Sequence, residues 1–409
     1  MSVRLGGAWC ARTHRHTALA GLLTLSAVLA GCSSSAQEDP PQDDPSAETS
    51  SAAPVESAAS ISTNLPDGPV AVDQVVKLNV QDGRFRRVAV TIGKGNKPLA
   101  GKLADDKTTW TSTQRLEPGV RYKVSTVAVD TEGVTASKRS VFRTQALSLD
   151  EQTYPSFAPL EGETVGVGMP VIVTFDVPVT AKASIEKHLT VTNTSGQKGA
   201  WHWISDNEVH WRPVHYWKPG TDVTVKADVN SVKAGNGVYG QLSRSMSFHV
   251  GDSVVSKVNV QSHRMKVFVN GALARTIPIS AGKPGFTTRS GVKVIVEKFR
   301  RKRMDAATTG VSRDDPEYYN MSNVEYAMRV TYTGEFIHAA PWSVGSQGSD
   351  NVSHGCVGMS TANAAWLYSI SKRGDVVDVT GSDRQMTLTN GYGDWNASFA
   401  EWKQGSALS

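Results

Sequence analysis

Two stretches of the chain share one pattern, "WTSTQRLEPGVRYKV" (110–124) and "WRPVHYWKPGTDVTV" (211–225). In each, a tryptophan is followed eight residues later by Pro-Gly, and an alternating apolar run typical of a strand comes next. The copies lie 101 residues apart, which is the length of one β-sandwich module. The repeat therefore predicts two tandem immunoglobulin-like domains, at residues 69–147 and 148–250.

The rest of the chain after residue 69 carries the same strand signals. Short alternating runs such as "PVIVTFDV" (170–177) and "RMKVFVN" (264–270) are separated by turn residues, and the second run ends at the hairpin signal Asn270-Gly271. The predicted fold class is therefore mainly β, with two tandem immunoglobulin-like β-sandwiches followed by a third β-sandwich domain at residues 251–380.

The tryptophans of the second predicted domain allow two interpretations, core packing or a platform on which sugars stack, and core packing is favoured. They are Trp201, Trp203, Trp211 and Trp217. One main helix is predicted in the third domain, capped by Ser360 or Thr361 and carrying an apolar stripe of Ala364, Ala365, Leu367 and Ile370. The tail at 381–409, with Trp395, Phe399 and Trp402, is expected to pack on that third domain.

The N-terminus has the layout of a secretory signal. Three arginines precede the apolar run "ALAGLLTLSAVLA" (18–30), which is too short to span a bilayer comfortably. The run ends in Leu29-Ala30-Gly31-Cys32, which resembles a bacterial lipobox. We therefore expect a signal peptide at 1–31, lipidation of Cys32, and a protein held at the outer face of the cell membrane. The alternative is a plain secreted protein with an incidental cysteine.

Residues 32–68 are expected to form a lipidated, disordered acidic tether. From Ser33 to Gly68 there are seven acidic residues and no lysine or arginine, and large apolar side chains are scarce. Without the signal and this tether, residues 69–409 carry a formal net charge of +9. Such a basic body can favour an anionic polymer or surface, and nothing in the chain indicates nucleic acid.

Cys356, in "SHGCVGMS" (353–360), is the one free thiol expected in the mature chain. Exported proteins usually pair their cysteines, so a single thiol is either a buried small apolar side chain or a reactive group. His354 and His338 stand near it in sequence, and a histidine can take the proton of a thiol that attacks an acyl carbon. If 353–357 runs extended, His354 and Cys356 point to the same side.

Two further features belong to this interpretation. Gly355 lets the backbone approach a substrate closely, and the N–H groups of Gly355 and Cys356 are candidates for an oxyanion site. The competing interpretation is a zinc site made by the two histidines and the cysteine. It lacks an evident fourth ligand and the usual paired spacing of ligands.

The stretch "HAAPWSVGSQGSDNVSHGCVGMS" (338–360) resembles the signature of the L,D-transpeptidases, which have a YkuD-type catalytic domain. Their pattern is a histidine, then 14–17 residues, then Ser/Thr-His-Gly-Cys, and fourteen residues separate His338 from Ser353 here. The whole chain is similar to actinobacterial lipoprotein members with two immunoglobulin-like domains, including the closing "GDWNASFAEW" (393–402).

The resemblance implies roles for individual residues. Cys356 matches the nucleophile, His338 the general base and acid, and His354 the second motif histidine that shapes the site. Gly355 and Cys356 match the oxyanion donors, and the carbonyl of Ala339 matches the group that orients the base. Tyr319 matches the tyrosine of the flap over the substrate. Met304 and Trp342 match two pocket positions, and Thr333 and Gly334 match the strand edge that lines the acyl site.

This sequence departs from the family pattern at Gly358, where the family has asparagine two residues after the nucleophile. A side-chain contact to substrate is lost there unless backbone or water replaces it. Some relatives hold calcium on an acidic hairpin of the second sandwich, but the matching stretch "SVKAGNGVYG" (231–240) offers Lys233 and Asn236 instead. Neither a metal nor another cofactor is predicted.

The resemblance implies a peptidoglycan L,D-transpeptidase that joins diaminopimelate residues of two stem peptides by a 3→3 cross-link, through a thioester on Cys356, with release of D-Ala. Carbapenems are expected to acylate the same thiol. Three alternatives stay open: an L,D-carboxypeptidase, a catalytically weak wall-binding scaffold, and a cysteine peptidase acting on proteins. The basic run "EKFRRKRM" (297–304) is either a solvated hairpin or a surface that attracts anionic stems.

Overall fold

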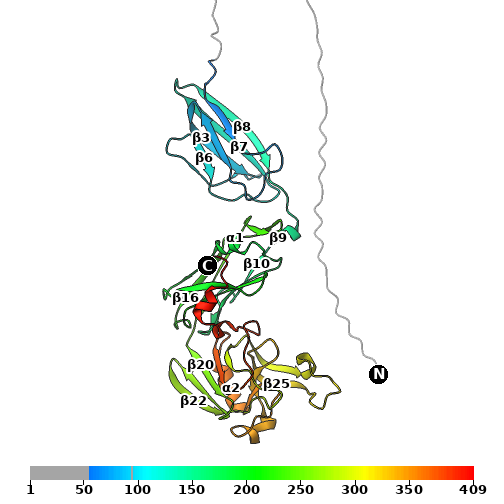
Figure 1. Cartoon of the computed structure of the whole chain (residues 1–409). Helices are drawn as coiled ribbons and strands as arrows, with labels where there is room; N and C mark the ends of the chain where they lie inside the picture. The colour runs from blue at the N-terminus through cyan, green and yellow to red at the C-terminus, as the bar shows by residue number, and fades with distance from the viewer. Residues whose placement is uncertain (1–54, 94) are drawn as a thin grey trace, which may run out of the picture. The chain divides into compact units, whose positions relative to one another are not determined.

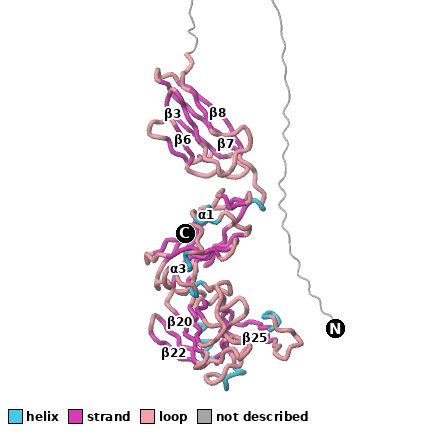
Figure 2. Tube along the Cα trace, in the orientation of Figure 1, coloured by secondary structure: helices cyan, strands magenta, loops and turns pink. Residues whose placement is uncertain are grey.

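The computed structural model of the chain describes residues 55–93 and 95–409, which Figure 1 colours along the sequence. The predicted signal peptide and Cys32 lie outside these residues. Strands dominate the described part and its helices are short (Figure 2), so the predicted mainly β class is confirmed. No helix within these two ranges is long and apolar enough to cross a membrane.

Two four-stranded sheets enclose the first core. The first sheet contains, in order, β1 (Ser60–Thr63), β2 (Lys77–Gln81), β6 (Thr109–Ser112) and β5 (Gly101–Leu103). The second contains, in order, β4 (Lys97–Pro98), β3 (Gly83–Ile92), β7 (Arg121–Asp130) and β8 (Thr135–Arg143). Every second residue of β7 is buried, because alternate side chains of a strand point to the same face.

The first sandwich begins earlier than predicted. Strand β1 pairs antiparallel with β2, Ala59 is buried in the core, and the Ser57 hydroxyl donates to Asp130 Oδ2 at 2.9 Å. The predicted disordered tether is therefore wrong for residues 55–68, and the boundary lies before residue 69. The acidic composition indicated disorder, but a strand edge of β2 distant in sequence supplies the hydrogen bonds that order this segment.

The second sandwich also has two four-stranded sheets. The first contains, in order, β10 (Pro155–Ala158), β12 (Val171–Phe175), β15 (Glu208–Pro213) and β14 (Gly199–Trp203). The second contains, in order, β11 (Thr164–Val165), β19 (Arg244–Val250), β16 (Asp222–Ala227) and β13 (Leu189–Asn193). Beside them lie a small sheet and two short helices: β17 (Lys233–Gly235), β18 (Val238–Gly240), β9 (Gln152–Thr153), η1 (Leu149–Glu151) and α1 (Lys182–Glu186).

The internal repeat occupies equivalent places in the two sandwiches. Trp110 on β6 and Trp211 on β15 are each 7% exposed. Gly119 and Gly220 have φ of +66° and +76°, a region that glycine enters without steric cost, and β7 and β16 follow them. The tryptophans of the second sandwich are all 8% exposed or less, so core packing is confirmed for Trp201, Trp203, Trp211 and Trp217.

The third region is built on two more sheets. The five-stranded sheet contains, in order, β22 (Ala272–Pro278), β21 (Arg264–Val269), β20 (Val254–Asn259), β28 (Val376–Thr380) and β23 (Gly291–Val294). The four-stranded sheet contains, in order, β24 (Glu297–Asp305), β25 (Asn320–Arg329), β26 (Phe336–Ala339) and β27 (Val357–Met359). Two 3₁₀ helices follow β24 and β26: η2 (Ala306–Thr309) and η3 (Pro341–Ser346).

The main predicted helix is α2 (Thr361–Ile370), which packs on β25 and β26. The side chain of Ser360 caps it by accepting a hydrogen bond from the N–H of Asn363 at 3.3 Å. Ala364 and Leu367 of the predicted apolar stripe are buried in the core between the sheets. The helix follows the cysteine motif directly, and so it fixes the end of the strand that carries the motif.

The C-terminal segment, with η4 (Asp394–Asn396) and α3 (Phe399–Lys403), corrects the prediction for the tail. The first part of the tail does pack on the third region, where the side chain of Asn396 accepts from the N–H of Val292 at 2.8 Å and Asn390 bonds to Thr333. The end of the tail packs on the second sandwich instead. The indole N–H groups of Trp395 and Trp402 donate to the carbonyls of Gly168 and Ala200 at 2.8 and 2.9 Å. The guanidinium of Arg212 lies 4.8 Å from the ring centroids of both tryptophans. This buried cation needs flat ring faces, which the tail supplies.

Candidate active site

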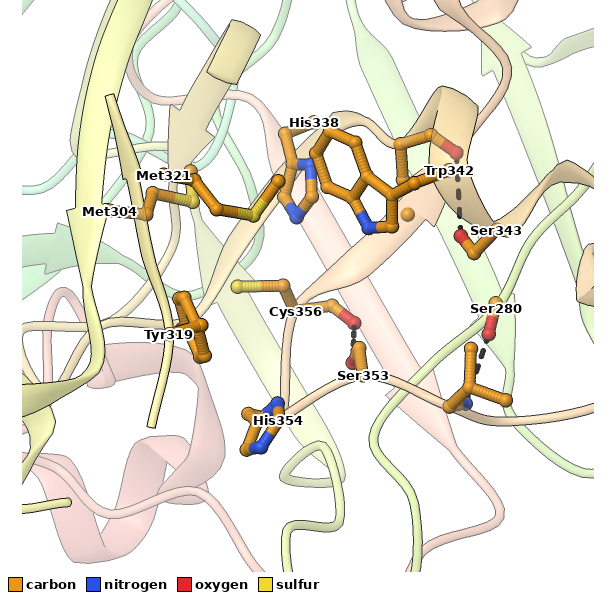
Figure 3. A pocket seen from close by; sticks show the side chains of 13 residues that line it. Ser280, Met304, Tyr319, Met321, His338, Trp342, Ser343, Ser353, His354 and Cys356 are labelled. Atoms are coloured by element: carbon orange, nitrogen blue, oxygen red, sulfur yellow. Dashed lines mark hydrogen bonds between the residues drawn. The ribbon is translucent and has the colours of Figure 1, made fainter. Parts of the chain in front are cut away.

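A pocket of about 300 Å³ opens beside Cys356, and Figure 3 shows the side chains that line it. Seven of the residues predicted for the site meet there, although they come from four separate parts of the third region. They are Met304, Tyr319, His338, Trp342, His354, Cys356 and Gly358. The structure therefore gathers most of the predicted site into one pocket.

The turn that presents Cys356 depends on glycine and on two hydroxyl groups. Gly355 has φ of +119°, a conformation that side chains disfavour, so the segment is bent rather than extended. The Ser353 hydroxyl accepts from the N–H of Gly355 at 3.1 Å and donates to the carbonyl of Cys356 at 2.6 Å. Thr288 donates to the carbonyl of Gly355 at 2.9 Å. The predicted use of the Gly355 N–H for an oxyanion therefore requires Ser353 to release it.

His338 reaches the pocket from β26, which runs parallel to β27 and places His338 opposite Gly358. Its Nδ1 donates to the carbonyl of Ala339 at 2.7 Å, as the resemblance implied. Because a carbonyl only accepts, Nδ1 carries the proton and Nε2 keeps a lone pair. The ring stacks on Trp342 with centroids 5.8 Å apart. The imidazole is thus fixed in the tautomer that a base requires.

Burial keeps this pair neutral when no substrate is bound. It raises the pKa of the Cys356 thiol to about 12, although the backbone of Phe336 acts in the opposite direction. Burial also lowers the pKa of His338, although the hydrogen bond to Ala339 opposes this effect. Both shifts leave the proton on sulfur. The resting site therefore holds a thiol and a neutral imidazole, and the charged pair forms only during reaction.

His354 forms one wall of the pocket. Its Nε2 lies 2.8 Å from Oε2 of Glu317, and the same oxygen accepts from Nζ of Lys283 at 2.5 Å. Lys283, and after it His354, lowers the pKa of Glu317. The ring centroids of Phe286 and Tyr319 lie 4.6 and 5.0 Å from that of His354. This histidine therefore shapes the site through ring packing and a hydrogen bond to Glu317.

The hairpin of β24 and β25 covers the pocket with apolar side chains. Met304, at the end of β24, pairs with Met321 on β25, and Tyr319 precedes that strand. All three line the pocket and belong to one cluster with Cys356. Trp342, on η3, is 55% exposed and lines the pocket from another element. These walls present mainly apolar surface around the sulfur.

Gly358 is packed so closely that a larger side chain does not fit without movement. A Cβ atom at this position would lie 2.9 Å from Cβ of Ala340. The backbone N–H and carbonyl of Gly358 bond to the carbonyl and N–H of Ser280 at 2.8 and 2.9 Å. The backbone therefore does not replace the substrate contact that the asparagine of the family pattern implies.

Thr333 and Gly334 were predicted to line the acyl site as a strand edge, and this prediction is wrong in part. Both lie in the turn before β26, and Gly334 has φ of +100°. The Thr333 hydroxyl accepts from Asn390 at 3.0 Å, and so it faces the C-terminal segment. The Gly334 carbonyl, however, lies 3.7 Å from Sγ of Cys356. The orientation of this turn therefore depends on Asn390, which is distant in sequence and bonds to Thr333.

The pocket also contains residues that sequence reasoning missed. They are Ser280, Met321, Ala340, Ser343 and Val352; Ser353 was named only as the first residue of the motif and was given no role. Met321 had a signal, because it lies two positions after Tyr319, and in an extended stretch such residues point to the same side. Ser280 had none, since only a β-bridge to Gly358 brings it to the motif. Within the described ranges, His, Cys, Asp and Glu side chains form no group of three suited to a metal ion.

Known proteins resemble both the immunoglobulin-like region and the third region of the chain. Residues 253–379 match the family model described as L,D-transpeptidase catalytic domain, and residues 67–233 match the one described as Bacterial Ig domain. L,D-transpeptidase 2 of Mycobacterium tuberculosis (strain CDC 1551 / Oshkosh) is 34% identical over 350 residues, which cover 85% of each chain. L,D-transpeptidase 5 of Mycobacterium tuberculosis (strain ATCC 25618 / H37Rv) is 35% identical over 363 residues, 87% of this chain and 76% of the relative.

A solved structure of the LD transpeptidase LdtMt1 in complex with imipenem is 35% identical, covers 55% of this chain and 97% of its own, and has a TM-score of 0.49. The sequence relatives extend over most of the chain, and the matched catalytic domain contains both His338 and Cys356. The chain therefore belongs to the L,D-transpeptidase family and is an L,D-transpeptidase with an immunoglobulin-like region before its catalytic domain.

Proposed function

We propose that this L,D-transpeptidase makes 3→3 cross-links between diaminopimelate residues of peptidoglycan stem peptides in the cell wall. The donor is a tetrapeptide stem ending in D-Ala, and the acceptor is the side-chain amine of a second stem. The observation that carries the proposal is one apolar pocket that holds a nucleophile, Cys356, together with His338, whose Nε2 keeps a lone pair.

The reaction follows from these two groups. Sγ of Cys356 attacks the carbonyl between diaminopimelate and D-Ala while its proton passes to Nε2 of His338. His338 then protonates the departing D-Ala amine, and a thioester remains on sulfur. The acceptor amine attacks the thioester and gives its proton to His338, which returns it to sulfur as the new amide forms. We assign the N–H of Cys356 to the oxyanion, because Ser353 occupies that of Gly355.

The walls of the pocket favour an amine over water as acceptor. Met304, Met321, Tyr319 and Trp342 present apolar surface to the region above the sulfur. Exclusion of water prevents hydrolysis of the thioester, which would give the carboxypeptidase product. A strained β-lactam carbonyl is also an acyl donor for this thiol, and we therefore expect carbapenems to acylate Cys356.

We further propose that the enzyme is a lipoprotein, anchored at Cys32 on the outer face of the cell membrane with its catalytic domain in the wall space. The support is the lipobox-like sequence at residues 29–32, preceded by the apolar run. Mass analysis of the protein isolated from its membrane tests this assignment. A diacylglycerol adduct on Cys32 is the expected result, and an unmodified Cys32 contradicts it.

The cross-linking proposal is tested with purified protein and disaccharide-tetrapeptide, with products read by mass spectrometry. The expected product is a cross-linked dimer formed with loss of one D-Ala, and Cys356→Ala is expected to fold normally and make none. Disaccharide-tripeptide without dimer indicates a carboxypeptidase. No product together with binding to sacculi indicates a scaffold, and digestion of casein indicates a peptidase.

A further inference from the structure

Behind Cys356 lies a cluster of three charged side chains that the reaction above does not use. Nζ of Lys293 lies 2.5 Å from Oε2 of Glu335, and Nη1 of Arg289 lies 2.9 Å from Oε1. The backbone N–H of Arg289 donates to the same Oε1 at 3.1 Å. Lys293 is 0% exposed and Glu335 is 4% exposed. Two cations thus share one carboxylate, and the formal net charge of the three side chains is +1, although burial lowers the pKa of Lys293.

The cluster is in contact with the turn that carries the nucleophile. Glu335 lies in sequence between Gly334, whose carbonyl is 3.7 Å from Sγ of Cys356, and Phe336, which packs in one apolar cluster with Cys356. A Cβ atom placed on Gly355 would lie 3.6 Å from Cγ of Glu335. The side chain of Glu335 therefore lies against Gly355, and its two cationic partners are held near the turn through this carboxylate.

Stability does not explain the two buried charges, those of Lys293 and Glu335, at this place. Desolvation of an ion pair costs several kcal/mol per ion, and well-packed apolar side chains of the same volume are often as stable. Buried charges beside a nucleophile instead suit a reaction in which charge develops. When the proton leaves Cys356 for His338, a negative charge appears on the sulfur. Because Cys356 is only 7% exposed, little water is present to solvate this charge.

We propose that Arg289, Glu335 and Lys293 form a positioning group whose net positive charge stabilises the thiolate of Cys356 during attack. Burial is the largest cause of the raised pKa of the Cys356 thiol; Glu335 raises this pKa further, and Lys293 lowers it, as a cation near the sulfur should. The inference rests on Cys356 as nucleophile, and it does not depend on which stem peptides are joined.

Other charged or titratable groups also face the sulfur or its neighbours and stay unchanged in the experiment below. They are His338 on β26, Arg329 on β25, Tyr319 before that strand, and His354 with Glu317 and Lys283.

The test measures the rate at which iodoacetamide alkylates Cys356 in the full-length protein between pH 7 and pH 9. Lys293→Met removes one cation, so the cluster becomes neutral and the thiolate is less populated. Loss of a neighbouring charge shifts a pKa by about one to three pH units, which lowers the thiolate population. A more basic thiolate is also a better nucleophile, and this offsets part of the loss in rate. We therefore expect alkylation to slow by about three- to tenfold. Unfolding exposes the thiol and speeds alkylation, so it cannot imitate this result.

The double variant Lys293→Met/Glu335→Gln separates charge from structure. It removes the whole ion pair but restores the net charge of +1 through Arg289, and the introduced amide keeps an oxygen for the Arg289 donors. We expect its alkylation rate to return to within about threefold of the wild-type rate, following the charge. A purely structural role predicts instead that the double variant is as slow as the single one, or is unfolded.

Two further variants complete the design. Arg289→Gln removes the other cation, whose side chain is 13% exposed, and is expected to slow alkylation in the same direction. Lys298→Met is the matched control, because its ammonium caps the carbonyls of Tyr368, at 2.8 Å, and Ser371 instead, and it should leave the rate unchanged. A wild-type rate for Lys293→Met, no recovery in the double variant, or equal slowing by Lys298→Met overturns the proposal.

Discussion

His210 joins the second sandwich to the C-terminal segment, and its protonation is expected to control stability at alkaline pH. Nδ1 lies 2.8 Å from Oδ1 of Asp394, and Nε2 lies 3.0 Å from Oε1 of Glu208. His210 is 2% exposed and Asp394 is 0% exposed. Burial opposes a charge on the ring, but the two carboxylates outweigh it and raise the pKa of His210 to about 9.

The magnitude follows from the two pKa values. The pKa rises from 6.5 to about 9, a difference of about 2.5 pH units, which corresponds to about 3 kcal/mol. Because the folded state holds the proton more tightly than the unfolded state, this contribution is fully present below pH 6.5. It is lost progressively as the pH rises from 6.5 through 9. His210→Gln is therefore expected to cost about 3 kcal/mol at pH 6 and much less at pH 10.

Urea unfolding at pH 6, 8 and 10 measures this difference in the transition that includes the second sandwich. The matched control is His249→Gln, because His249 also pairs with a carboxylate, Asp222, at 2.8 Å but has a side chain that is 45% exposed. Because this pair is exposed, the control is expected to change the free energy of unfolding at pH 6 by less than about 1 kcal/mol. If His210→Gln and wild type lose stability equally between pH 6 and pH 10, the ion pair with Asp394 does not have the role argued here.

Three other perturbations test the catalytic domain. His338→Ala is expected to slow acylation at least about 10²-fold, since it removes the proton acceptor; unchanged turnover with disaccharide-tetrapeptide would assign the base elsewhere. Burial raises the pKa of Asp375 to about 7, so this carboxyl group lowers the stability of the fold as the pH rises from 3.8 to 7. Asp375→Asn should therefore increase the free energy of unfolding at pH 8, by about 4 kcal/mol at most, and leave it unchanged at pH 3. Equal free energies of unfolding for variant and wild type at pH 8 contradict this. On β24, the side chains of Arg301 and Arg303 are each 62% exposed. Neutralising both should raise KM at low salt but not at 1 M salt, where the Debye length is about 3 Å. Equal KM values for variant and wild type at low salt show that the two arginines do not attract the substrate.

The mainly β class was predictable because its signal is local. Alternation of apolar residues states which face of a strand is buried, and the Trp to Pro-Gly repeat marks the same place in two successive sandwiches. The motif around Cys356 was also predictable, since the thiol, the glycine and the helix that follows are contiguous in the chain. Gly355, with φ of +119°, shows why that position needs glycine.

Contacts distant in sequence decided the rest. Residues 60–63 look like part of a tether until β2 offers them an edge to pair with. The C-terminal aromatic residues were expected on the wrong domain, because no local pattern reveals that the buried guanidinium of Arg212 requires ring faces.

The catalytic domain divides in the same way. The sequence, through its resemblance to the family, predicted the nucleophile, the base and the carbonyl that orients the base, because these lie on two short segments with characteristic spacing. The tertiary structure decided that Ser353 occupies the Gly355 N–H, that Ser280 holds Gly358, and that Lys293 and Glu335 meet near the turn that carries the thiol. The physical reason is that burial and charge pairing depend on which strands become neighbours, and a single sequence does not state those pairings.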